Sequence, residues 1–193
     1  MQPTHNKARL EQFSDGVFAI AITLLALELR VPHLAHTDIA SSALELAPLI
    51  PNILTFILSF MTIAIFWVNH HQLTQVTGRI SRRILWSNIL ILLFVTLIPF
   101  ATETMSQNPY HPLAVMTYSF VLFGGSLSFS LLRYFVHHGL GEKKVSMGRS
   151  AIGPLLYIIA IFGAIASVWI SYAALAIPPL FYFLPKNRPV PTE

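Results

Sequence analysis

The sequence predicts an all-α integral membrane protein, and its hydropathy, its scarcity of charge and its long apolar runs together carry that prediction. Hydrophobic residues make up 54% of the 193 residues and charged residues only 10%, with a mean hydropathy of +0.65. A soluble domain carries about a quarter charged residues, so this chain has too few to coat a soluble surface. The absence of cysteine excludes disulfides, thiolate catalysis and zinc sites built on cysteine.

Six apolar runs are candidates for membrane-spanning helices, each of which needs roughly 20 mostly apolar residues. The block 150–184 contains no Lys, Arg, Asp or Glu and is too long for one span, so we expect two short helices that break near Ser167. Pro178 and Pro179 then bend or end the last one. The expected spans are about 12–30, 48–71, 83–103, 112–135, 150–167 and 168–184.

These spans predict a single six-helix transmembrane domain over residues 1–185 and a cytoplasmic tail over 186–193. The longest connector, about 31–47, is expected to carry a short external helix, because its second half favours helix and Thr37 or Asp38 can cap it. There is little room elsewhere for a soluble domain.

The distribution of basic residues supports six spans. With six, both termini and two loops share one side, and Arg30 is the one basic residue on the other side. The positive-inside rule places the basic side in the cytoplasm, so we expect a multi-pass protein of the cell (plasma) membrane with both termini cytoplasmic. Topology explains the basic loops, so they imply mild attraction to anionic membrane lipid and no nucleic-acid partner. The basic side holds Lys7, Arg9, Arg79, Arg82, Arg83, Arg133, Lys143, Lys144, Arg149, Lys186 and Arg188.

Polar side chains gather at a similar depth near the predicted cytoplasmic ends of the first three spans. A polar group in hydrocarbon costs several kcal/mol unless it finds a partner, so we expect these groups to satisfy one another. Asp15 is expected to accept a hydrogen bond from a histidine, from the Trp67 indole, from Asn88 or from Arg9. We call this set the polar cluster: Ser14, Asp15, Trp67, Asn69, His70, His71, Ser87 and Asn88.

The polar cluster has a structural and a functional interpretation. The structural one is a clasp that fixes the packing of the first three spans. The functional one is a proton-sensitive or ion-binding site. Metal binding is disfavoured, because His70 and His71 point about 100° apart on a helix.

Helical periodicity groups four residues of the first span, which we call the aliphatic face: Ile20, Thr23, Leu24 and Leu27. All four lie within about 60° of the Ile20 direction, whereas Ser14 and Asp15 lie more than about 100° away. Glu28 flanks the face near its outer end. Such a face is typical of lipid contact or helix packing, but it also suits a pore wall in a symmetric oligomer, where a hydrophobic constriction gates by dewetting. Periodicity alone leaves both interpretations open.

The stretch RLEQFSDGVFAIAIT resembles the R-x-x-x-F-S-D signature of the transmembrane protein 175 family, the endosomal and lysosomal potassium channels and their prokaryotic relatives. Arg9, Phe13, Ser14 and Asp15 supply every fixed position. FWVNHH in the second span and LWSNILILLFVTLIPF in the third also resemble the family, so the likeness covers about residues 7–105. Animal members carry two six-helix repeats, whereas this chain has one and is similar to the tetrameric prokaryotic form.

The resemblance implies a homotetramer in which the first helix of each subunit lines a central pore, with no re-entrant P-loop. The family's constriction is made of bulky aliphatic layers, which fall here on Ile20, Leu24 and Leu27. Its hydroxyl layer, tied to potassium preference, falls on Thr23. The resemblance assigns the signature residues to packing between helices. Together with members of the polar cluster, they make up the expected signature and interhelix clasp: Arg9, Phe13, Ser14, Asp15, Trp67, His70, His71 and Asn88.

We therefore expect a potassium-permeable channel with passive, leak-type conduction, and no enzyme activity or cofactor. Potassium would pass near Ile20 and Thr23, with Glu28 at the outer mouth. The expected partners are other copies of the chain, membrane lipid and permeant monovalent cations. Two alternatives stay open: a proton-coupled transporter that uses Asp15 and the histidines of span 48–71, and a non-conducting membrane interaction protein.

Overall fold

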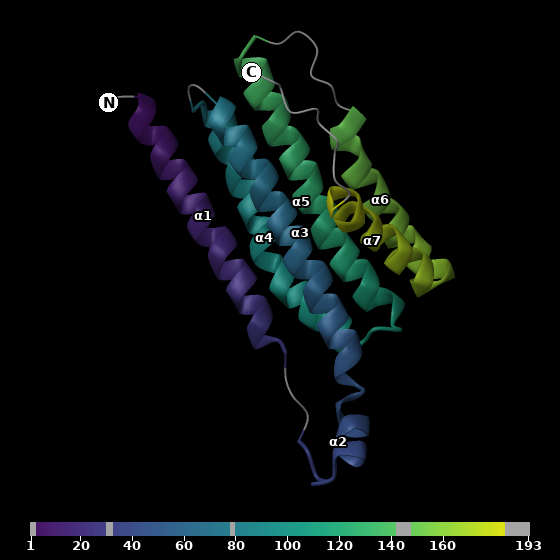
Figure 1. Cartoon of the computed structure of the whole chain (residues 1–193). Coiled ribbons are helices and arrows are strands. Elements are labelled where there is room, and N and C mark those ends of the chain that lie inside the picture. The colour runs from purple at the N-terminus through teal and green to yellow at the C-terminus, as the bar shows by residue number, and fades with distance from the viewer. Residues whose placement is uncertain (1–2, 30–32, 78–79, 142–147, 184–193) are drawn as a thin grey trace, which may run out of the picture.

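The computed structural model describes residues 3–29, 33–77, 80–141 and 148–183, and within them every regular element is a helix (Figure 1). The tail expected at 186–193 lies outside the described residues. The helices are α1 (Pro3–Leu27), α2 (Ile39–Leu46), α3 (Leu49–Val76), α4 (Arg82–Gln107), α5 (Pro112–Gly139), α6 (Gly148–Ala166) and α7 (Val168–Phe183).

Four helices in the described part of the chain are long and apolar enough to cross a membrane: the Lys7–Leu27 part of α1, and α3, α4 and α5. The chain is therefore a multi-pass membrane protein. Two shorter apolar helices, α6 and α7, follow and meet at Ser167, which is not helical. Pro178 and Pro179 lie inside α7, which continues to Phe183, so these prolines do not end the helix.

Helix ends differ from the predicted spans at the basic end of the bundle. α1 begins well before residue 12, and α3 continues to Val76 instead of stopping at 71. Hydropathy marks the apolar zone, whereas a helix continues for as long as its residues tolerate helical geometry. The Lys7 ammonium donates to the backbone carbonyl of Gln75 at 3.0 Å, which ties the start of α1 to the end of α3.

The connector between α1 and α3 carries α2, which confirms the predicted short helix and its cap. Asp38 is the N-cap, and its carboxylate accepts from the Ser41 backbone N–H at 2.9 Å. This backbone hydrogen bond lowers the pKa of Asp38. His36 Nδ1 lies 2.6 Å from Glu45 Oε1, which holds the connector against α2.

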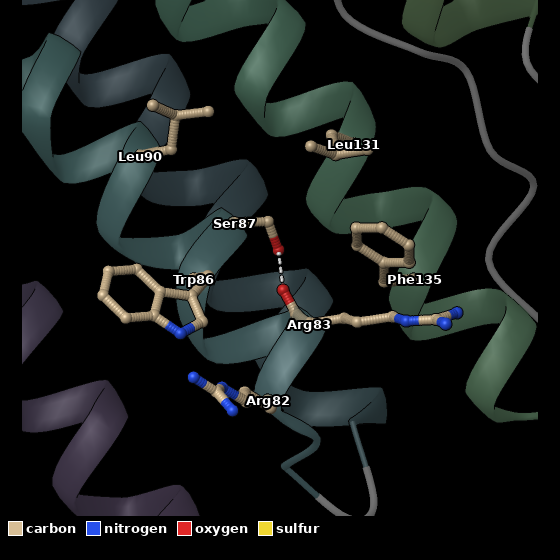
Figure 2. Close-up of a pocket in the computed structure, with 7 residues that line it drawn as sticks. All are labelled: Arg82, Arg83, Trp86, Ser87, Leu90, Leu131 and Phe135. Carbon is tan, nitrogen blue, oxygen red and sulfur yellow. Dashed lines mark hydrogen bonds between the residues drawn. The ribbon is translucent and has the colours of Figure 1, made fainter.

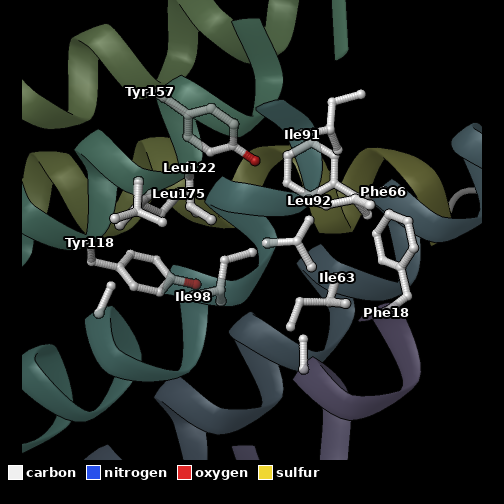
Figure 3. Packing of buried hydrophobic residues seen from close by; sticks show 14 of the residues in the cluster. Phe18, Ile63, Phe66, Ile91, Leu92, Ile98, Tyr118, Leu122, Tyr157 and Leu175 are labelled. Atoms are coloured by element: carbon white, nitrogen blue, oxygen red, sulfur yellow. The ribbon is translucent and has the colours of Figure 1, made fainter. Parts of the chain in front are cut away.

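The bundle is built around α4 and α5. α1 packs on α3 and α4, whereas α6 packs on α5 and α7, so α1 and α6 lie at opposite edges (Figure 1). Figure 3 shows the apolar core between them, to which Phe18, Ile91 and Leu122 contribute. Close helix approach is part of this packing, because a Cβ at Gly124 would overlap the Phe94 ring.

Candidate functional site

The buried face of α1 packs on α3 and α4. Its residues recur at a spacing of three or four, which keeps them on one side of a helix. Phe18 is 1% exposed, and its ring lies 5.5 Å from the His70 ring, centroid to centroid. The members of this face are Leu10, Ser14, Phe18, Ala21 and Leu25.

The aliphatic face points away from the bundle. Ile20 is 60% exposed, Leu24 42% and Leu27 72%, and Thr23 is also exposed. Within the described part of the chain these side chains are left largely open. They therefore meet lipid, water or another chain.

Thr23 gives the aliphatic face one polar group. Its hydroxyl donates to the backbone carbonyls of Ala19 at 3.0 Å and Ile20 at 2.9 Å. A hydroxyl has one hydrogen and two acceptor lone pairs. Because the hydrogen is used within the helix, the oxygen keeps acceptor capacity toward a cation on the exposed side.

A buried chain of hydrogen bonds links α1, α4 and α3 through Ser14, Asn88 and His70. Asn88 Nδ2 donates to Ser14 Oγ at 3.0 Å, and Ser14 Oγ donates to the Leu10 carbonyl at 2.8 Å. His70 Nε2 lies 2.6 Å from Asn88 Oδ1, and an amide oxygen only accepts, so His70 is the donor. Each helix contributes one member, which fixes their mutual depth and rotation.

A second group of polar contacts lies at the exposed edge of the α1–α3 contact. The Trp67 indole donates to Asp15 Oδ1 at 2.9 Å. The His71 ring stacks on Trp67 with centroids 5.7 Å apart, and its Nε2 lies 2.9 Å from Gln75 Nε2. The Trp67 indole is therefore the predicted donor that the fold brings within hydrogen-bond distance of Asp15.

The other predicted members of the polar cluster and clasp are Asn69, Ser87, Arg9 and Phe13. Asn69 Nδ2 donates to the Ile65 carbonyl and Ser87 Oγ to the Arg83 carbonyl, both at 2.8 Å on their own helices. Arg9 is exposed, and so is Phe13. Neither is brought into the polar cluster, because both lie about 100° or more around α1 from Ser14.

The remaining candidates are Glu28 and the histidine pair. Glu28 is half-buried just past the end of α1. His70 is buried and His71 is exposed, so the two rings point apart. Across the residues that the structure describes, no group of three or more His, Asp or Glu is placed to hold a metal ion.

Sequence reasoning missed Phe18, the aromatic centre of the buried face. Its signal is present, since Phe18 follows Ser14 by four residues and precedes Ala21 and Leu25 by three and seven. It also missed a groove between α4 and α5, described below. That groove joins residues far apart in the chain.

The family model described as Endosomal/lysosomal potassium channel TMEM175 matches residues 9–99, from the start of the spanning part of α1 into α4. A potassium channel from Chryseobacterium sp. (strain P1-3) is 31% identical over 94% of this chain and 95% of its own length. A potassium channel from Chamaesiphon minutus is 31% identical over 93% of this chain and 94% of its own length.

A solved structure is also similar. The crystal structure of a lysosomal potassium-selective channel TMEM175 homolog from Chamaesiphon minutus matches with a TM-score of 0.83 and 31% identity. The match covers 95% of this chain and 100% of that one. Fold, length and sequence therefore agree along nearly the whole chain, and the protein belongs to the transmembrane protein 175 (TMEM175) family.

Proposed function

We propose that the chain is the subunit of a potassium-permeable cation channel in which ions pass passively between the α1 helices of four copies. The similar bacterial proteins are named potassium channels, and the similar crystal structure is of a potassium-selective one. The observation in this chain that carries the proposal is the aliphatic face. It leaves large apolar side chains and one hydroxyl exposed on a helix that buries Leu10, Ser14, Phe18, Ala21 and Leu25 on another side.

In the proposed tetramer the aliphatic faces surround a common axis. Ile20 forms the tightest ring, with Leu24 and Leu27 above it toward the outside. Leu27 lies about 10 Å of helix rise from Ile20, so the apolar zone is short enough for a brief dehydrated passage. Such a constriction gates by dewetting. Thr23 oxygens beside the Ile20 ring offer potassium a polar contact within that zone.

The other proposed features follow from charge and from packing. The subunit has six spans, with α6 and α7 as the two short ones, and lies in the cell membrane with its basic end and both termini in the cytoplasm. Glu28 and neighbouring acids raise the local cation concentration at the outer mouth. The polar cluster positions α1 against α3 and α4, and conduction needs no cofactor and no chemical step.

Proton-coupled transport has less support than passive conduction. It would use Asp15 together with the histidines of α3. Among the described contacts Asp15 is bonded to Trp67 and His70 to Asn88. The two groups thus belong to separate contacts, one exposed and one buried.

The test is potassium and sodium flux into liposomes that contain the purified full chain. Ile20→Asn replaces the apolar ring with polar groups, which lowers the cost of hydrating the constriction, so potassium flux should rise. The matched control is Ile159→Asn on α6, at the opposite edge of the bundle, where the isoleucine is 51% exposed. That change should leave flux unaltered. Absence of cation flux in both wild type and Ile20→Asn would reject the channel.

A further inference from the structure

A groove of about 500 Å³ lies between α4 and α5 at the basic end of the bundle (Figure 2). Arg82 and Arg83, the first residues of α4, line it at that end. The rest of the lining is mainly apolar: Trp86, Leu90, Leu131 and Phe135. The groove therefore has a cationic end, formed by Arg82 and Arg83, which we call its cationic head, and an apolar remainder, which we call its apolar body. A ligand with an anionic group and an apolar chain could contact both.

The cationic head spans the groove. The Arg83 guanidinium lies 5.9 Å from the centroid of the Phe135 ring, so it reaches from α4 toward α5, as Figure 2 shows. This cation–π contact holds the charge in place. Arg82 is exposed and lies on the Trp86 side, and among the residues that the structure describes none of those lining the groove is acidic. Arg82 and Arg83 thus bring two positive charges to the lining at this end of the groove, with their guanidinium groups pointing to opposite sides (Figure 2).

The apolar body continues from this head toward the middle of the helices. Leu90 lies one turn of α4 beyond Trp86, and Leu131 lies one turn of α5 before Phe135. The side chains of Trp86, Leu90 and Leu131 are all exposed. The Ser87 hydroxyl donates to backbone carbonyls of its own helix, so it does not make this part of the groove polar.

We propose that this groove binds an anionic phospholipid, with the lipid phosphate at the end that Arg82 and Arg83 line and an acyl chain along Leu90 and Leu131. The planar guanidinium matches a phosphate in a bidentate fashion. Basic pockets between transmembrane helices are suited to anionic headgroups. A free phosphate would contact the arginines alone, whereas a phospholipid also covers the apolar wall.

The simpler interpretation is that the two arginines extend to the membrane surface and attract anionic lipid without holding it. The two interpretations differ in the effect of removing charge elsewhere at the same end. Lys7 and Arg9 supply that comparison, because the Lys7 contact with Gln75 places the start of α1 beside the end of α3, and neither residue lines the groove. A bound lipid should depend on Arg82 and Arg83 alone.

The experiment is native mass spectrometry of the full chain in detergent, titrated with phosphatidylglycerol, phosphatidylcholine or inorganic phosphate. Wild type should retain phosphatidylglycerol in preference to phosphatidylcholine, and inorganic phosphate should not displace it. Arg82→Gln/Arg83→Gln should weaken phosphatidylglycerol binding by about tenfold or more. Lys7→Gln/Arg9→Gln, which removes the same charge, should leave it within about twofold of wild type.

A second variant separates charge from geometry and preserves the fold. Arg82→Lys/Arg83→Lys keeps both charges but loses the planar forks, so binding should fall between wild type and the glutamine variant. Thermal unfolding of each variant verifies that the fold is intact. Equal weakening by the groove and α1 glutamine variants would overturn the proposal in favour of diffuse attraction. Equal affinity for both lipids, or displacement by inorganic phosphate, would overturn it as well.

Discussion

The buried face and the aliphatic face belong to the same helix, α1, but the contacts within the chain account for only one of them. The buried face is explained by contacts within the chain, since α3 and α4 cover it and Ser14 finds its partners there. The aliphatic face is not, because the rest of the chain leaves it open. An exposed aliphatic row is ordinary on a lipid-facing helix, so the Thr23 hydroxyl within that row is what favours a pore over plain lipid contact.

Substitution of two phenylalanines on α1 compares most directly how much each face contributes to stability. Phe18 is 1% exposed and Phe13 is 63% exposed. Phe18→Ala leaves a cavity against His70 and should lower the free energy of unfolding by about 3–5 kcal/mol. Phe13→Ala removes a side chain that makes little contact within the subunit, so its effect should stay below about 1 kcal/mol. Equilibrium unfolding in mixed detergent micelles measures both.

The control for this pair is the oligomeric state, measured by light scattering. Both variants are compared with wild type as dissociated single chains, so that packing within the chain is not confused with contacts between copies. Similar destabilisation by the two substitutions would contradict the two-faced description of α1.

The second largest effect should come from Asn88, the centre of the buried hydrogen-bond chain. Asn88→Leu strands the His70 donor, whereas Ser14 keeps its bond to the Leu10 carbonyl. We expect a loss of about 1–3 kcal/mol, the cost of one unsatisfied buried group. Adding His70→Leu removes the stranded donor, so the double variant should be more stable than Asn88→Leu alone. Simple additivity of the two changes in unfolding free energy would show that the residues act independently.

Hydropathy and charge predicted the membrane class and the approximate helices, because a membrane requires long apolar segments. The predicted span ends at residue 71, whereas the helix α3 continues to Val76, since the polar residues after His71 remain helical. Asp38 could be identified as a cap because capping is a local interaction. Local signals in the sequence therefore predict which segments are helical. They do not predict where each helix ends, because a helix can continue beyond its apolar segment.

The same limit applies to the candidate site, where features within one helix could be predicted and contacts between helices could not. Periodicity could separate Ser14 from Ile20, because their angle depends only on the geometry of α1. It could not choose the donor to Asp15, because that depends on how α1 and α3 are rotated and spaced. The groove was out of reach for the same reason. Arg83 and Phe135 lie 52 positions apart, and only packing brings them together.

Substitutions of Thr23 test whether the aliphatic face contributes to the selection of potassium over sodium. Thr23→Val keeps the shape and removes the oxygen, so it should lower the potassium-to-sodium permeability ratio roughly tenfold, equivalent to about 1.4 kcal/mol, while ions still pass. Thr23→Ser keeps a hydroxyl and should retain the wild-type ratio. Reversal potentials under bi-ionic conditions in planar bilayers measure the ratio. An unchanged ratio in Thr23→Val would remove this hydroxyl from the selectivity mechanism.

The smallest effect should come from Asp15, at the edge between the two faces. Asp15→Asn loses the charge but keeps a side-chain oxygen that accepts from the Trp67 indole. Because this contact is exposed, the unfolding free energy should fall by no more than about 1 kcal/mol. Potassium flux should persist. Asp15→Leu removes the acceptor and should destabilise more than Asp15→Asn.

Asp15→Asn also separates passive conduction from proton coupling. A transporter that moves protons through this carboxylate would lose pH-coupled transport in Asp15→Asn while the fold stayed intact. A channel whose ions pass along the aliphatic face would conduct potassium in that variant at every pH where the fold persists. Flux measured with and without a pH gradient, in wild type and Asp15→Asn liposomes side by side, distinguishes them. If the asparagine amide replaces the Asp15 carboxylate without loss of potassium flux, the carboxylate acts as a contact between helices and not as a proton carrier. We expect this result, because the amide oxygen can accept the same hydrogen bond from the Trp67 indole.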